Sequence, residues 1–385
     1  MIRPLLGFGL MLCVALSAAQ GPVVLGKSAI IIDEISGRVL WAKDANTQRY
    51  PASTTKIMTS LLLLESLPLT STITAPADTE RVTGSSLHLR IGEQISAKDA
   101  LYAMLLRSAN DVCHAVAFRI SGSDAVFAER MNERAAQIGC KNTTFRNPNG
   151  LPDPEHKTTA YDLAMIGREA MKNDIFREVV RTRKAWLSRS VNQDDLLVIN
   201  RNKWLEKDPT ADGIKTGFTD DAGQTYVGSA TRNGFRVITV ILNTTDWQAD
   251  HKAMLDWAYS EYGISKKLKK GAPLAELPIG NGASKDVPVA LAQNFRIISR
   301  KTGEKASIKW MGTAPTAPIR AGDSLGEVEI RAEDGYTIRV PVVAAKDVQR
   351  ASIFSSFSAS NASWYVLGGA MLMGAWVVRR RVRTA

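Results

Sequence analysis

Ser53-Thr54-Thr55-Lys56 is the stretch that decides the fold, because two later triplets complete a pattern with it. They are Ser108-Ala109-Asn110 and Lys215-Thr216-Gly217. A Ser-x-x-Lys tetrad alone is weak evidence, since a chain of 385 residues contains about one by chance. The ordered set of three motifs is far more specific and predicts an enzyme that transfers acyl groups through a serine.

The residue types of the first motif suit nucleophilic catalysis. Acyl transfer needs a nucleophile, a base for its proton, a proton relay to the leaving group and donors for the oxyanion. Residues i and i+3 share a helix face, so Ser53 and Lys56 meet if a helix starts near Pro51-Ala52, as the proline and the apolar run after it indicate. Lys56 acts as a base only if its pKa is lowered, and burial beside a second ammonium from Lys215 would lower it.

The second motif is expected on a loop that follows a helical run over Ala97 to Arg107. There, Ser108 would relay a proton between the two lysines, and Asn110 would hold an amide of the substrate. Ser108 would thus complete a proton path that the first motif begins.

The third motif is expected on a strand next to a hairpin. The hairpin would pair Thr225 to Ala230 with Phe235 to Leu242, because Asn233-Gly234 between β-rich runs is a strong turn signal. Lys215 and Thr216 would then offer a cation and a hydroxyl to a substrate carboxylate. Gly217 would let the substrate backbone approach closely.

With these motifs the chain resembles the low-molecular-weight D-alanyl-D-alanine carboxypeptidases, a branch of the penicillin-binding proteins. The resemblance covers nearly the whole chain. Besides the three motifs it includes Leu105-Leu106-Arg107, Asn147-Pro148-Asn149-Gly150-Leu151-Pro152, His156 to Asp162, Asn200-Arg201-Asn202, Asp212-Gly213-Ile214 and Ala317-Pro318-Ile319. It implies an α/β (α+β) fold: a β-lactamase/transpeptidase-like catalytic domain with an antiparallel sheet and a helical subdomain, then a small β-sandwich domain and a C-terminal transmembrane helix.

The resemblance also assigns roles to residues. It implies that Ser53 is the nucleophile, that Lys56 is the general base, and that the backbone N–H groups of Ser53 and Phe218 form the oxyanion hole. Arg201 would assist near the lysine pair. The chain departs from the family at Ala109, where Gly is usual, and at Phe218, where some relatives have His, so no role for a His side chain is carried over.

The implied activity is removal of the terminal D-alanine from peptidoglycan stem pentapeptides through an acyl-enzyme, without a cofactor and with inhibition by β-lactams. A D,D-endopeptidase, a weak transpeptidase or a β-lactamase could use the same site. Of these enzymes, a β-lactamase is the less favoured alternative. A non-catalytic scaffold that binds cell-wall peptides is the alternative of another class, and the intact Ser53, Lys56 and Lys215 disfavour it.

Charge and composition indicate which classes of binding partner the protein lacks. The net charge is +11, but Arg3 and the four arginines after residue 378 carry five of these charges, and the remainder forms no long basic block. We therefore expect no nucleic-acid partner. The four histidines are scattered without zinc-ligand spacing, so no metal site is expected. Cys113 and Cys140 are expected to be unpaired, with Cys113 buried.

The sequences near the two chain ends predict that the protein is exported and anchored in a membrane. Arg3, an apolar run over Leu5 to Leu16 and small residues after it are typical of a signal peptide. Near the C-terminus, an apolar run lies between Trp364-Tyr365 and a group of arginines, as in membrane spans. The predicted organisation is a signal peptide (1–19), a catalytic domain (26–262), a β-rich domain (269–346), a linker (347–362), a transmembrane anchor (363–378) and a cytoplasmic basic tail (379–385). This organisation places the catalytic body on the extracytoplasmic face of the cell membrane.

Overall fold

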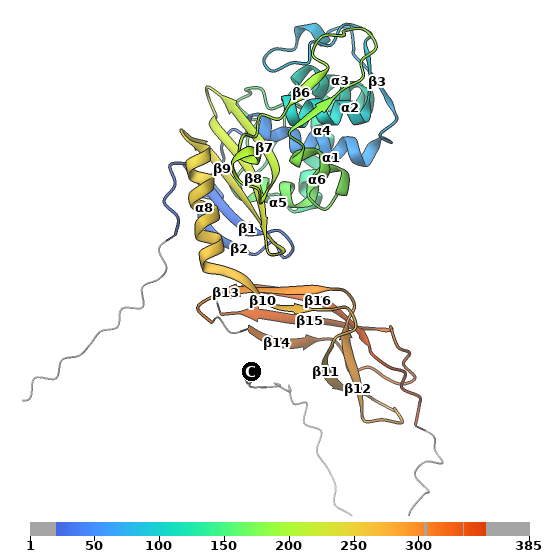
Figure 1. The fold of residues 1–385 in the computed structure, drawn as a ribbon. Helices are drawn as coiled ribbons and strands as arrows, with labels where there is room; N and C mark the ends of the chain where they lie inside the picture. The colour runs from blue at the N-terminus through green and yellow to red at the C-terminus, as the bar shows by residue number, and fades with distance from the viewer. Residues whose placement is uncertain (1–20, 304–305, 334, 352–385) are drawn as a thin grey trace, which may run out of the picture. The chain divides into compact units, whose positions relative to one another are not determined.

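The computed structural model describes residues 21–303, 306–333 and 335–351 (Figure 1). The predicted signal peptide, transmembrane anchor and basic tail, and most of the linker, lie outside these residues. Among the described residues, no helix has the length and apolar character needed to cross a membrane. The described residues form two compact units. The first takes in the chain up to Ile32, Val39–Ala230 and Ile238–Trp257, and the second Asp33–Arg38, Thr231–Val237 and the chain from Ala258 onward.

The first unit is built on a five-stranded sheet with the strand order β2-β1-β9-β8-β7. The strands are β1 (Ser28–Asp33), β2 (Val39–Lys43), β7 (Ala211–Thr219), β8 (Gly223–Arg232) and β9 (Phe235–Thr244). The predicted hairpin of β8 and β9 is confirmed. It turns at Asn233-Gly234, where both residues have positive φ (52° and 80°), as a tight turn between twisted strands requires. Strand β7, which carries the third motif, lies at one end of the sheet.

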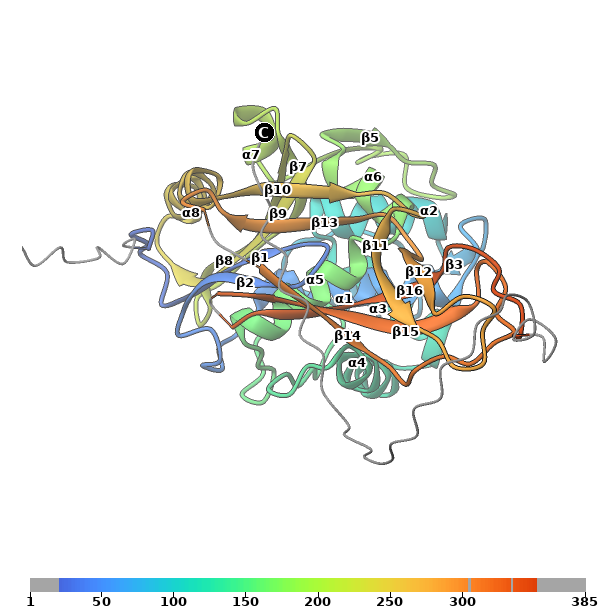
Figure 2. The same ribbon diagram turned by 90° about the horizontal axis from the view of Figure 1, so that it is seen from below.

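Helices cover both faces of this sheet, because successive side chains of a strand point to opposite faces. On one face lies α8 (Trp247–Glu261), whose His251 shares a hydrogen bond with Thr239 of β9. On the other face lies α5 (Ala160–Ala170), where a Cβ on Gly167 would stand 3.3 Å from Val227 Cγ1 and 4.0 Å from Ile238 Cγ2. Figures 1 and 2 show α8 and α5 on opposite sides of the strands.

The helical part of the first unit surrounds an apolar core that reaches the sheet. Its helices are α1 (Lys56–Ser66), α2 (Ala97–Tyr102), α3 (Asn110–Ser121), α4 (Asp124–Ile138), α5, α6 (Asp174–Arg181) and α7 (Trp204–Lys207), and short ribbons form from β3 (Thr72–Thr74) with β4 (Gln94–Ser96) and from β5 (Lys184–Trp186) with β6 (Leu197–Ile199). Helix α4 has a well-defined start and end. Ser123 caps its first turn, which is worth about 1 kcal/mol, and Gly139 (φ 99°) ends it.

The second motif lies differently from the prediction. The predicted loop placement is wrong for Asn110, which is the first residue of α3. The preceding helical run is α2 followed by a wide π-helical turn over Ala103–Arg107, and the chain then reverses at Ser108, whose φ is 67°. Ala109 has φ −63° and ψ 115°, which any residue adopts, so Ala in place of the family's Gly requires no special backbone angle.

The second unit is a β domain, as predicted. Strands β10 (Tyr262–Leu268) and β13 (Phe295–Arg300) form one sheet. The other sheet has the order β11-β12-β16-β15-β14, with β11 (Pro273–Pro278), β12 (Asp286–Leu291), β14 (Ala306–Met311), β15 (Ser324–Ala332) and β16 (Thr337–Ala344). Leu268 of β10 and residues such as Val289 and Val340 of the other sheet share one apolar core. Val348, beyond the predicted end of this domain at residue 346, is also buried in that core.

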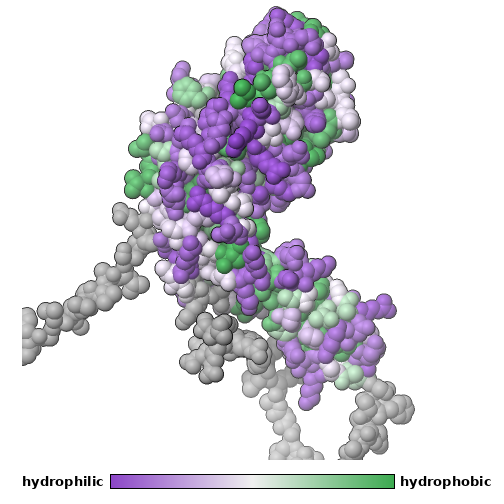
Figure 3. Space-filling model, viewed as in Figure 1, coloured by the Kyte–Doolittle hydropathy of each residue, from purple (hydrophilic) through white to green (hydrophobic). Residues whose placement is uncertain are grey.

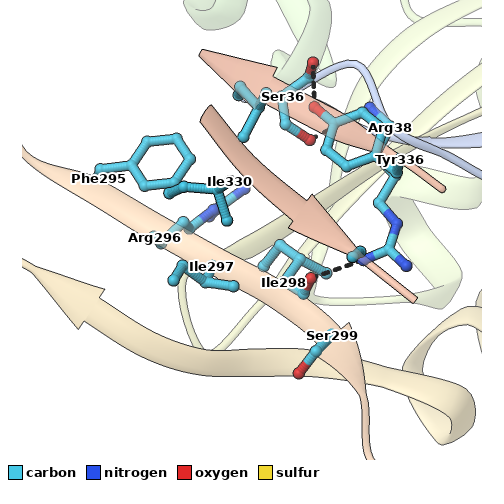
Figure 4. Close-up of a pocket in the computed structure, with 11 residues that line it drawn as sticks. Ser36, Arg38, Phe295, Arg296, Ile297, Ile298, Ser299, Ile330 and Tyr336 are labelled. Atoms are coloured by element: carbon cyan, nitrogen blue, oxygen red, sulfur yellow. Dashed lines mark hydrogen bonds between the residues drawn. The ribbon is translucent and has the colours of Figure 1, made fainter. Parts of the chain in front are cut away.

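A small cavity lies inside the second unit (Figure 4). Its walls include β13 and β15, and Arg38 Nη1 donates a hydrogen bond to Ile298 O (2.8 Å) beside it. Tyr336 Oη donates to Ser36 O (3.1 Å) at another edge. The cavity measures about 30 Å³, which is room for a water molecule or two and not for a peptide. The catalytic motifs all lie in the first unit, where the substrate site must therefore be sought.

Candidate active site

The first motif brings a hydroxyl and an amine into contact. A 3₁₀ turn, η1 (Ala52–Thr55), carries Ser53 and leads directly into α1, whose first residue is Lys56. Lys56 Nζ lies 2.9 Å from Ser53 Oγ, within hydrogen-bond range. The predicted pairing of the two residues across one turn is thus present, although the first turn is 3₁₀ and not α.

Lys56 is completely buried, and its surroundings favour the neutral amine. Desolvation by burial is the largest cause that lowers the pKa of Lys56 to about 8, and Arg201 lowers it further. Nζ also donates to the backbone carbonyl of Asn149 (2.6 Å). This hydrogen bond helps to hold the amine in place beside Ser53.

The segment Asn147–Leu151 clamps the nucleophile turn. A Cβ on Gly150 would lie 1.9 Å from Ala52 O, and Gly150 has φ 85°, so both space and backbone require glycine there. Pro148 O accepts a hydrogen bond from Thr59 Oγ1 of α1 (2.5 Å). The sequence does not reveal the role of this segment. A backbone carbonyl that holds a catalytic lysine leaves no side-chain signal.

His156 also stabilises the nucleophile turn through Thr55. The amide of Arg146 donates to Nδ1 (3.1 Å), so Nε2 carries the hydrogen and donates to Thr55 Oγ1 (2.9 Å). Burial lowers the pKa of His156 to about 4, which keeps the ring neutral and preserves this pair of bonds near neutral pH. His156 was predicted as part of the family segment only, and its contact with Thr55 was missed.

The second motif contributes two buried polar groups with unused capacity. Ser108 Oγ and Asn110 Oδ1 are buried and have no hydrogen-bond partner among the described residues. Asn110 Nδ2, in contrast, donates to Thr83 O (2.7 Å) and is occupied. A buried polar atom without a partner is costly, so both oxygens are suited to bind a ligand group or water.

The third motif lies against the nucleophile turn. Lys215 is 1% exposed, and burial together with the positive charges of Lys56 and Arg201 holds its pKa well below the ordinary value. A Cβ on Gly217 would lie 2.9 Å from Ser53 N, so β7 passes directly beside the nucleophile. The backbone of Phe218 continues this strand, while its side chain is 62% exposed. A side chain at position 217 would clash with the nucleophile turn, so this close approach requires glycine.

A groove of about 390 Å³ opens beside these motifs. It is lined by Gly84, Ser85, Ser86, His88, Arg107, Leu197, Ile199 and Arg201. Arg201 Nη1 donates to Ser85 Oγ (2.6 Å), and Ser85 O accepts from the amide of Asn110 (2.6 Å), which joins the groove to the second motif. Arg201 also lowers the pKa of both lysines through its charge, so it lies in the same electrostatic site.

The remaining predictions about this region concern cysteines and metals. Cys113 is free and fully buried on α3, and burial raises the pKa of its thiol to about 12, so the predicted buried, unpaired thiol is confirmed. Cys140 is free and partly buried. In the part of the chain that the structure describes, no group of His, Cys, Asp and Glu side chains is arranged to hold a metal ion.

Taken as chemistry, the site contains a hydroxyl nucleophile in contact with an amine of lowered pKa. A second buried lysine and a buried hydroxyl without a partner among the described residues lie in the same first unit, and a strand edge runs beside the nucleophile. These are the parts that acyl transfer through a serine requires. The site combines two elements, since Lys56 lies on α1 and Lys215 lies on β7.

Comparisons with known proteins agree with this chemistry. Residues 15–246 match the D-alanyl-D-alanine carboxypeptidase family, and residues 262–350 match the C-terminal domain of penicillin-binding protein 5. The D-alanyl-D-alanine carboxypeptidase DacF of Bacillus subtilis (strain 168) is 30% identical over 349 residues, which cover 88% of this chain and 90% of that protein. DacD of Escherichia coli (strain K12) is 29% identical over 357 residues, 88% of this chain and 91% of its own length.

Solved structures show the same architecture. Penicillin-binding protein 5 from Haemophilus influenzae superposes with a TM-score of 0.73 at 26% identity, and the match covers 86% of this chain and 99% of that one. PBP3 from Streptococcus pneumoniae, described as a peptidoglycan synthesis regulatory factor, gives a TM-score of 0.75 at 25% identity over 85% of this chain and all of that one. The chain therefore belongs to the D-alanyl-D-alanine carboxypeptidase family of serine peptidases.

Proposed function

We propose that this protein removes the terminal D-alanine from peptidoglycan stem pentapeptides through an acyl-enzyme on Ser53. The contact that carries the proposal is the 2.9 Å approach of Lys56 Nζ to Ser53 Oγ, at a lysine whose pKa is lowered to about 8. In this role Lys56 takes the proton of Ser53 as Oγ attacks the carbonyl between the two D-alanines. The membership of the family supports this activity and the inhibition by β-lactams that is typical of the family.

The oxyanion of this attack would be held by the backbone N–H groups of Ser53 and Phe218. The close approach of Gly217 to Ser53 N supports the assignment, because it brings the β7 backbone next to the nucleophile. The loss of one preorganised oxyanion-hole donor costs about 2.7–4 kcal/mol. The positions of these two backbone N–H groups depend on the backbone and not on the side chain. Phe218, in place of the His found in some relatives, therefore leaves both donors available.

The leaving D-alanine needs a proton, and we assign its relay to Ser108. Its buried Oγ has no partner among the described residues and is therefore free to donate to the leaving nitrogen and to accept from Lys215 or Lys56. Asn110 Oδ1 is similarly available to accept the N–H of a substrate amide. Water then hydrolyses the ester at Ser53 and completes the carboxypeptidase cycle without a cofactor.

The substrate carboxylate is assigned to Lys215 and Thr216. We expect Lys215→Arg to retain more D-alanine-releasing activity than Lys215→Ala, since the arginine keeps a cation for the free carboxylate. The measurement is kcat/KM for a soluble pentapeptide with both variants, with thermal unfolding as a check that each folds. Equal activity of the two variants would show that the carboxylate does not depend on a cation at position 215.

The same family context supports the proposed topology. We place the catalytic domain at 26–262 and the body on the extracytoplasmic side of the cell membrane, held by the single span at 363–378 and followed by the basic tail at 379–385. The arginines after residue 378 suit the cytoplasmic side of a span. The second domain includes Val348, which is buried, and Arg350, which bridges to Gly282, so we place its end beyond the predicted residue 346.

Truncation tests the anchor. A chain that ends at Ala351 keeps every residue of the second domain that the structure describes as buried, and we expect it to be released as an active, water-soluble protein while the full chain sediments with membranes. The measurement is activity in the soluble and membrane fractions after expression of each form. Continued sedimentation of the truncated protein with membranes would place the anchor elsewhere in the chain.

A further inference from the structure

The ribbon of β5 and β6 presents an unusual outer face. Trp186 of β5 is 73% exposed and stands directly opposite Leu197 of β6 in the antiparallel register. Ile199, two residues along β6 on the same face, is 53% exposed. Leu197 between them is partly buried. Single exposed apolar residues are normal on protein surfaces, whereas two that adjoin a partly buried leucine on one ribbon face form an apolar patch that can bind a partner. Figure 3 shows that hydrophilic residues dominate the visible face of the described protein, with apolar residues in small patches.

The exposure of this face is built into the ribbon. The alternate residues Ala185 and Val198 point to the other side, and Val198 is fully buried in the core. The loop that joins the two strands is fixed by Arg189, which forms an ion pair with Glu93 (2.8 Å) in which both side chains are fully buried. A ribbon held on its inner face and at its loop cannot turn Trp186 inward, so its indole remains available to solvent or to a ligand.

The same ribbon lines the groove that adjoins the second motif. Leu197 and Ile199 line this groove with Ser85, Ser86 and Arg201. Arg201 lies close enough to the catalytic lysines to lower the pKa of both, and Ser85 is bonded to the amide of Asn110. A substrate chain that leaves the catalytic site along this groove therefore passes along β6 and reaches the face that carries Trp186.

The length of a stem peptide fits this path. The attacked carbonyl belongs to the fourth residue, so three residues separate it from the sugar, and they span about 10 Å when extended. Strand β6 ends at Ile199, and Leu197 precedes Arg201 by four residues, so their backbones lie at most about 14 Å apart. The part of the substrate that arrives at Trp186 is then the amino sugar. A pyranose ring presents C–H groups on one face, and these pack on the electron-rich face of an indole.

We propose that the face formed by Trp186, Leu197 and Ile199 binds the glycan strand of polymeric peptidoglycan. The proposal rests on the proposed function, since it takes the groove to be the path of the stem peptide. It assigns no role in the chemistry to Trp186, and it predicts that the surface distinguishes a peptide carried on a glycan from the same peptide free in solution.

The test compares two substrates. One is a soluble pentapeptide without sugar, and the other is pentapeptide-rich polymeric peptidoglycan. For Trp186→Ala, we expect kcat/KM on the polymer to fall on the order of tenfold, the equivalent of about 1.4 kcal/mol, and kcat/KM on the soluble pentapeptide to stay within about twofold. Trp186→Tyr, which keeps a flat ring, should recover most of the loss. Ile308→Ala, which removes an exposed apolar side chain from the second unit, serves as the matched control and should change neither value.

A second arm needs no catalysis. Co-sedimentation with insoluble glycan strands stripped of their peptides should retain the wild-type protein more than Trp186→Ala. The proposal is overturned if the two proteins sediment equally, or if the variant loses activity equally on both substrates. If the wild-type protein fails to release D-alanine from the soluble pentapeptide yet still binds stripped glycan through Trp186, the proposed function fails and the glycan surface stands.

Discussion

Labelled penicillin is expected to acylate the wild-type protein and to leave Ser53→Ala unlabelled. Acylation forms a covalent bond to Ser53 Oγ, and the variant has no atom at that position to form it. Because Ser53 is only partly buried on a 3₁₀ turn whose neighbours Thr54 and Thr55 are fully buried, removal of one oxygen should leave the fold intact. The measurement is fluorescence of the labelled band after denaturing electrophoresis.

The exposed Ser188 offers a matched control for the nucleophile. Ser188→Ala removes the same atom from a surface loop and should label as the wild type does. Full labelling of Ser53→Ala would show that another residue is the nucleophile and would remove the basis of the proposed mechanism.

Replacement of Lys56 by arginine is expected to reduce the acylation rate by about a thousandfold, within the range of 10²–10⁴ for the loss of a positioned base. The wild-type lysine has a pKa of about 8, so a useful fraction is neutral near pH 7 and can accept the proton of Ser53. An arginine stays protonated at every working pH and cannot accept it. Acylation rates from stopped-flow or quenched reactions measure the difference.

The pH dependence has a definite sign. Because the neutral amine is the active form, wild-type acylation should rise with pH through the region of about 8 and then level off. Lys203→Arg, at a half-exposed lysine, controls for the substitution itself and should keep the wild-type rate and profile. Near-normal acylation of a folded Lys56→Arg variant would assign the base to another group.

Much of the site could be predicted from sequence, because its parts lie in short motifs with fixed spacing. Ser53 and Lys56 are three residues apart on one turn, and the turn residues Asn233-Gly234 define the hairpin next to the third motif. Local chemistry of this kind is visible in a single sequence. The order of the three motifs then indicated that distant segments come together, but it did not predict the distances or orientations of their side chains.

The missed features depend on contacts between segments that are distant in sequence. Asn149 O binds Lys56 across 93 positions, and His156 reaches Thr55 across 101. No periodicity or propensity encodes either contact. The wrong prediction for Asn110 has a local cause. The chain reverses before α3 at Ser108, whose φ is 67°. Serine rarely adopts this left-handed conformation, so the sequence gives no sign of the reversal. The apolar face of β5 and β6 was also invisible, because exposure depends on which side of the ribbon packs on the core.

The most direct test of the central claim is the release of D-alanine from a soluble pentapeptide by the purified protein. We predict one D-alanine per peptide, a tetrapeptide as the end product, and complete loss of release after pretreatment with penicillin or in Ser53→Ala. If the protein is acylated by penicillin at Ser53 but releases no D-alanine from the pentapeptide, it binds cell-wall peptides without hydrolysing them, and the assignment as a carboxypeptidase is contradicted.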